Sequence, residues 1–116
     1  MNERTEIITG GGRKRPAAMR VVAHLEYKNP NLAGRMWNTI CLGRIKGGYV
    51  ANYNVTTNTF GMSSPSAGVF LSPHAAVYDV IRRIREAIPG SASEEDRAFA
   101  LRLCDLAYDE VNPKLF

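Results

Sequence analysis

The clearest structural signal in the sequence lies in MWNTICLGRIKGGYVANYNV, residues 36–55. Two runs that are rich in strand-forming residues, 36–46 and 49–55, flank the pair Gly47-Gly48. Because glycine accepts positive φ without a steric penalty, this pattern predicts two antiparallel strands joined by a tight turn.

The register of this hairpin decides which side chains lie together. A two-residue turn at Gly47-Gly48 places Lys46 opposite Tyr49, and the pairing continues with 44 opposite 51 and 42 opposite 53. Paired positions share a face of the sheet. One face of the hairpin is therefore expected to carry two cations and two tyrosines: Arg44, Lys46, Tyr49 and Tyr53.

Strands are also expected on both sides of the hairpin. Residues 19–27 alternate between two faces, which is the period of a half-buried strand. Residues 28–35 are rich in turn formers and predict a loop. After the hairpin, the short apolar run 67–71 is expected to form the fourth strand, and residues 59–62 offer room for a further short strand.

The pattern then changes to the helical period. Ser72-Pro73 is typical of an N-cap followed by a first-turn proline, and an apolar stripe extends from there to the stop signal Pro89-Gly90. Ser93, with Asp96 three residues later, resembles a capping box at the start of a second helix, which ends before Asn112-Pro113. The stripe of the first helix consists of Val77, Val80, Ile81, Ile84 and Ile88.

These elements predict an α+β fold, with a four-stranded, mainly antiparallel meander followed by two α-helices. Residues 1–18, which include three consecutive glycines, are expected to form a flexible basic tail, and residues 19–116 a single domain. The first helix is expected to pack on one face of the sheet, leaving the other face open or covered by a partner. The second helix is apolar over a wide arc, which favours a homodimer or a larger assembly.

Composition places the chain among ordinary globular proteins. It has 116 residues, of which 45 % are hydrophobic and 22 % charged. No apolar run approaches the roughly 20 residues that span a bilayer, and the N-terminus lacks the apolar core of a signal peptide. Cys41 and Cys104 are expected to be reduced core residues. Together these features predict a cytoplasmic protein without a membrane partner.

The residues that carry most enzyme chemistry are few and scattered. His24 and His74 have no cysteine, histidine or carboxylate at ligand spacing, so the sequence predicts no metal site and no cofactor. Neither a Gly-x-Ser-x-Gly elbow nor a Cys-His motif is visible. Glu94, Glu95 and Asp96 are expected to cap the second helix and offset its dipole. We therefore expect a non-enzymatic protein.

The net charge of +4 is unevenly distributed along the chain. Residues 1–60 contain nine Lys/Arg against three acidic residues, a balance of +6, whereas residues 61–116 contain six against eight, a balance of −2. A basic half suits a phosphate-bearing partner, although solubility alone also explains such a balance. In the tail, Arg13, Lys14 and Arg15 are expected to contact the phosphates of a nucleic acid.

The most specific constellation is the basic, aromatic-containing sheet face defined by the hairpin register. Cations bind phosphates and aromatic rings stack on bases, so this face predicts binding of nucleic acid or of a small nucleotide. The alternative is that the tyrosines face the core and the cations only protect the hairpin from edge pairing. The expected binding residues are Arg35, Arg44, Lys46, Tyr49, Tyr53, Asn52, Asn54, Arg82 and Arg85.

Two similarities to known groups of proteins bear on the expected function. The order of four strands followed by a helix is similar to that of several single-stranded nucleic-acid binders, including the Whirly and Pur-alpha types. Small single-domain proteins without motifs are also typical of phages and mobile elements, where many inhibit a host protein. The leading expectation is thus non-enzymatic binding of nucleic acid or a nucleotide. The alternative is a phage protein that inhibits a host defence protein by direct contact.

Overall fold

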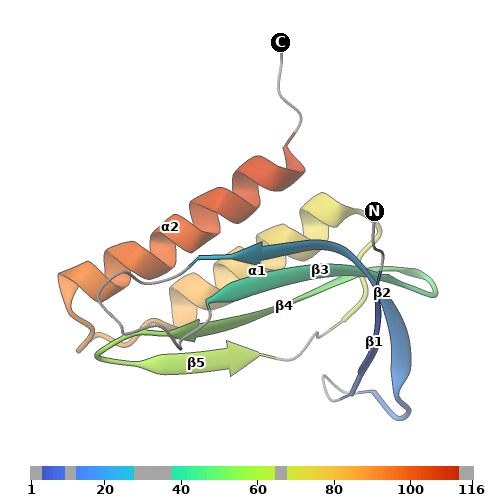
Figure 1. Ribbon diagram of the computed structural model, residues 1–116, viewed down its shortest axis with the longest axis horizontal. Coiled ribbons are helices and arrows are strands. Elements are labelled where there is room, and N and C mark those ends of the chain that lie inside the picture. Colours follow the sequence, from blue (N-terminus) through green and yellow to red (C-terminus); the bar gives the residue numbers. More distant parts are fainter. Residues whose placement is uncertain (1–3, 10–12, 28–37, 65–67, 113–116) are drawn as a thin grey trace.

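The computed structural model describes residues 4–9, 13–27, 38–64 and 68–112. It confirms the α+β class: five strands form one antiparallel meander, and two helices follow it (Figure 1). The sheet therefore has one strand more than expected. The strands are β1 (Thr5–Ile8), β2 (Ala17–Glu26), β3 (Thr39–Ile45), β4 (Gly48–Thr56) and β5 (Gly61–Ser64), and the helices are α1 (Pro73–Ala87) and α2 (Glu94–Val111).

The additional strand, β1, lies inside the segment expected to be a tail. It pairs with the beginning of β2, with Thr5 opposite Arg20 and Ile8 opposite Ala17. The side chain of Ile8 is buried. The sheet thus begins well before residue 19. A strand of four residues is too short for its alternation to stand out in the sequence.

The last strand overlaps residues 59–62, where a further short strand had room, and not the run 67–71. β5 occupies residues 61–64 and pairs with β4, whereas the run 67–71 was expected to form the fourth strand. The described part of that run, residues 68–71, contributes a single bridge between Phe70 and Tyr49. Gly68 has a φ of 75°, which breaks the extended backbone a strand requires.

The β3–β4 hairpin forms as predicted but in a different register. Arg44 pairs with Tyr49 and Ile45 with Gly48, so the turn residues are Lys46 and Gly47. A Cβ on Gly48 would lie 2.2 Å from the carbonyl oxygen of Phe70, so this glycine permits a close strand contact instead of forming the turn corner. Each β4 residue pairs two positions earlier on β3 than predicted. Because side chains alternate with period two, the predicted faces are unchanged.

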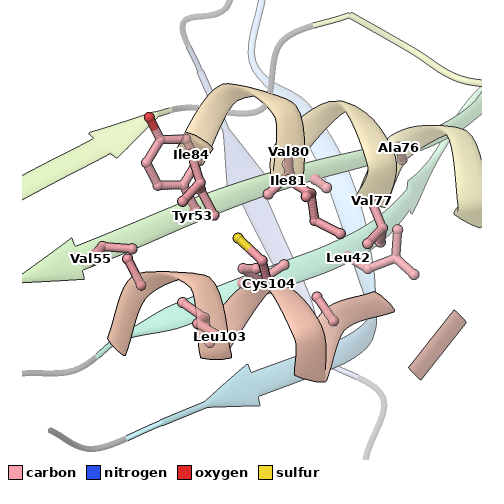
Figure 2. Packing of buried hydrophobic residues seen from close by; sticks show 14 of the residues in the cluster. Leu42, Tyr53, Val55, Ala76, Val77, Val80, Ile81, Ile84, Leu103 and Cys104 are labelled. Carbon is pink, nitrogen blue, oxygen red and sulfur yellow. The ribbon is translucent and has the colours of Figure 1, made fainter. Parts of the chain in front are cut away.

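Both helices lie on one side of the sheet (Figure 1). The cap of α1 is confirmed, since Ser72 Oγ accepts a hydrogen bond from Ala75 N at 3.1 Å. α1 packs mainly on β4, and α2 lies beside α1 and against β2 and β3. Neither described helix is long and apolar enough to cross a membrane. The whole predicted stripe of α1 is buried, and Figure 2 shows most of it meeting residues of α2 and the strands in one core.

The opposite face of the sheet is partly covered by the chain itself. β2 has an irregularity between Val21 and Ala23, and before it the strand turns away together with β1 (Figure 1). This turn packs Met19 and Ile8 into a second, smaller core with Cys41 and Val50, among others. The irregularity also divides β2, so that residues 19 and 21 face away from the helices and residues 23 and 25 face them.

Asp96 has a structural role that its place in the first turn of α2 did not reveal. The N-cap is confirmed, because Ser93 Oγ accepts from Asp96 N at 3.1 Å. The Asp96 carboxylate is buried, and its Oδ2 accepts from Thr59 N at 2.8 Å and from Thr59 Oγ1 at 2.6 Å. These hydrogen bonds hold the pKa of Asp96 below its usual value. The carboxylate therefore ties the β4–β5 loop to α2.

We expect Asp96→Ala to lower the free energy of unfolding by about 1–3 kcal/mol at neutral pH, because two donors of Thr59 lose their acceptor. The pKa of Asp96 is lower in the folded than in the unfolded state, so its contribution is complete above the unfolded value of about 4. Below that pH the advantage of the wild type shrinks. Urea unfolding at pH 7 and pH 3 measures both effects. Glu94→Ala, at an exposed position of the same turn, is the control, and an equal loss in both variants would contradict the tie to Thr59.

Candidate functional site

The structure places the expected binding residues of the hairpin on different faces of the sheet. Arg44 and Tyr49 are paired on the face that carries the helices, and the Arg44 guanidinium lies 5.9 Å from the centre of the Tyr49 ring. Tyr53 shares this face but is only 6 % exposed and belongs to the core beneath α1. Its ring is therefore not accessible for stacking on a base. The alternative expectation, in which tyrosine faces the core, holds for Tyr53.

The two asparagines lie on the other face of the sheet. Asn52 is paired with Cys41, and Asn54 with Thr39, on the side away from the helices. Asn54 is exposed and Asn52 half-buried. They cannot contact a ligand together with Arg44 unless that ligand wraps around the sheet.

The remaining candidate cations are scattered. Arg82 Nη2 donates to Asp79 at 2.7 Å and its Nη1 to Glu86 at 3.1 Å, so carboxylates already offset its charge. Arg85 is exposed on the same helix. Arg13 donates to the Gly68 carbonyl oxygen at 3.5 Å. Two other basic residues that follow the glycines, Lys14 and Arg15, are exposed, and Arg35 lies outside the described residues.

Two of the predicted cations do come together, and they do so with a third that the sequence did not single out. Arg44 and Lys46 line a groove of about 410 Å³ with Arg20, whose position on β2 is directly opposite Arg44. We call this site the basic groove. It lies on the helix-bearing face, beyond the part that the helices cover. Its lining residues are Thr5, Ala18, Arg20, Arg44, Ile45 and Lys46.

The side chains that line the basic groove include three cations. Arg20 and Arg44 occupy directly opposed strand positions, where like charges repel. No carboxylate is among the described lining residues. Arginine presents a planar fork of donors that matches a phosphate or carboxylate. An anion bound between the two guanidinium groups would offset their repulsion.

Arg20 was missed because its place depends on two features that are not local. β1 adds Thr5 beside it, and the irregularity between Val21 and Ala23 changes which residues of β2 share a face. Simple alternation along residues 19–27 groups Arg20 with His24. In the structure His24 lies on the opposite face, across from Cys41.

The closeness of His24 and Cys41 does not create a catalytic pair. Arg4 Nη2 donates to His24 Nδ1 at 2.9 Å, and His24 Nε2 donates to Glu26 Oε1 at 3.1 Å, so both ring nitrogens have partners. Burial raises the pKa of the Cys41 thiol to about 11, which keeps it protonated at neutral pH. Cys104 is likewise free and buried, with its pKa raised to about 11. No group of three potential metal ligands occurs in the described ranges.

Comparison with protein-family models, with curated proteins and with solved structures gave no significant match.

Proposed function

We propose that the protein binds phosphate-bearing ligands, foremost single-stranded nucleic acid, through the basic groove. The observation that carries this proposal is the direct opposition of Arg20 and Arg44 next to Lys46, with all three side chains exposed. Two arginines and a lysine on neighbouring strands suit consecutive phosphates better than a single anion. A nucleotide is the smaller ligand of the same chemistry.

The basic groove favours contact with the backbone of a nucleic acid over recognition of its bases. Tyr53 is buried, and the Tyr49 ring is half-buried with Arg44 above it. Without an open aromatic platform among the described lining residues, affinity rests on charge. Binding is then independent of sequence and falls steeply as the salt concentration rises.

The test is a titration of labelled oligonucleotides and of free nucleotides at two salt concentrations. Arg20→Ala, Arg44→Ala and Lys46→Ala combined should weaken oligonucleotide binding at least tenfold. The slope of log affinity against log salt should fall by roughly 0.7 for each phosphate that the variant no longer neutralises. All three side chains are exposed, so the melting temperature should not fall.

The control removes the same charge from the helices, as Arg82→Ala, Arg85→Ala and Arg102→Ala combined. It should retain most of the affinity, because Arg82 is already paired with carboxylates. Equal losses in the two triple variants would mean that only net charge matters and would reject the basic groove. A wild-type protein that binds none of the ligands would reject the proposed function.

Two other expectations from the sequence stay predictions. Inhibition of a host protein by direct contact is tested by none of the features above. Homo-oligomer formation was expected from the wide apolar arc of α2, but most of this arc is buried within one chain. Leu106 and Tyr108 are its large apolar residues that stay exposed.

A further inference from the structure

One face of the β1–β2 hairpin adjoins the basic groove and is open to solvent. Thr5 pairs with Arg20, and Ile7 pairs with Ala18 two positions further along, so the four side chains share a face. All four residues are exposed, and all but Ile7 line the basic groove. The other face of the hairpin packs Ile8 into the second core. The surface of the groove therefore continues along the hairpin.

The middle of this exposed face is apolar. The Ile7 side chain is 66 % exposed, and Ala18 beside it is exposed as well. The one carboxylate of β1, that of Glu6, lies on the opposite face and accepts a hydrogen bond from Arg4 Nε at 2.6 Å. An exposed aliphatic side chain next to Arg20 can pack against the base or the sugar of a nucleotide whose phosphate contacts that arginine.

Further cations lie at the far end of the hairpin. Lys14 and Arg15 are exposed and lie just before the first residue of β2, Ala17. At the rise of a strand, Ala17 and Arg20 are roughly 10 Å apart. A nucleic acid that has a phosphate on Arg20 and follows the hairpin therefore passes Ile7 before it reaches Lys14 and Arg15.

We propose that the nucleic-acid strand in the basic groove continues along the exposed face of the β1–β2 hairpin, with a base packed on Ile7 and phosphates on Lys14 and Arg15. This inference rests on the proposed function and adds to it an apolar contact that salt does not screen. The contact selects single strands, because a duplex keeps its bases stacked and paired. It does not select a sequence, since an aliphatic side chain packs on any base.

The phosphate contacts are tested with a labelled thymidine dodecanucleotide at two salt concentrations. Lys14→Ala with Arg15→Ala should weaken its binding at least fivefold, and the slope of log affinity against log salt should fall by roughly 1.4, which is 0.7 for each phosphate. Arg85→Ala with Arg102→Ala removes the same charge from exposed positions of the helices and should weaken binding less than twofold.

The apolar contact is tested with Ile7→Ala. This variant should bind the single strand at least twofold more weakly at both salt concentrations, with an unchanged slope, and should bind a duplex of the same length as the wild type does. Leu71→Ala truncates a side chain that is 93 % exposed outside the β1–β2 hairpin, and it should alter neither affinity. Because Ile7 and Leu71 are both exposed, the melting temperatures should stay at the wild-type value.

The results separate this path from the proposed function. If the triple variant of the basic groove weakens binding but either β1–β2 variant behaves like its control, the groove is retained and the path is rejected. An equal loss of single-strand and duplex binding in Ile7→Ala would also reject the path, because the bases of a duplex do not reach Ile7. A wild-type protein that binds neither probe would reject the path together with the proposed function.

Discussion

Replacing Ile84 with aspartate is expected to unfold the protein. Ile84 is fully buried in the stripe of α1, where that helix packs on the sheet (Figure 2). A carboxylate has no hydrogen-bonding group in this apolar core, and its burial costs several kcal/mol. Since domains of this size are stable by roughly 5–15 kcal/mol, the loss removes most or all of the stability.

Ala75→Asp is the matched control for Ile84→Asp. Ala75 is exposed in the first turn of the same helix, where a negative charge is favourable to the helix dipole. Circular dichroism during thermal unfolding should show a melting temperature at or above that of the wild type for Ala75→Asp. It should show no cooperative transition for Ile84→Asp. A cooperative transition near the wild-type temperature in Ile84→Asp would mean that α1 does not cover the sheet.

The features predicted correctly from the sequence are those encoded by neighbouring residues. The caps Ser72 and Ser93 and the helical stripe depend on residues within a few positions of one another, and the structure confirms them. The hairpin was also predicted, because a Gly-Gly pair between two strands is a local signal. Its register was wrong by two positions, since Gly48 serves a contact with Phe70, 22 residues away.

The features that were missed depend on distant parts of the chain. The irregularity between Val21 and Ala23 has no local signature, yet it places Arg20 on the same face of the sheet as Arg44. The role of Asp96 depends on Thr59, in the loop between β4 and β5. The basic groove combines three strands, so two of its cations were predicted and the third was not.

The second core requires a residue without a side chain at Gly43, and no pattern in the sequence indicated this requirement. A Cβ on Gly43 would lie 2.1 Å from Met19 Cγ and 2.2 Å from Met19 Sδ. Met19 is fully buried, so its side chain has no space into which it can withdraw. Gly43→Val should therefore push the β1–β2 hairpin away from β3, and the free energy of unfolding should fall by about 1–3 kcal/mol.

The cause of that loss is tested by a double-mutant cycle with Met19→Ala, which removes the clashing atoms. Met19→Ala alone should cost about 2–5 kcal/mol, because it leaves a cavity against Cys41 and Val50. In the double variant the new valine occupies part of that cavity, so the combined loss should be smaller than the sum by about 0.5–3 kcal/mol. Gly90→Val is the control, since a Cβ there meets nothing within 4 Å. Additive losses in urea unfolding would show that Met19 does not pack on Gly43 and that β1 and the first half of β2 do not cover this face of the sheet.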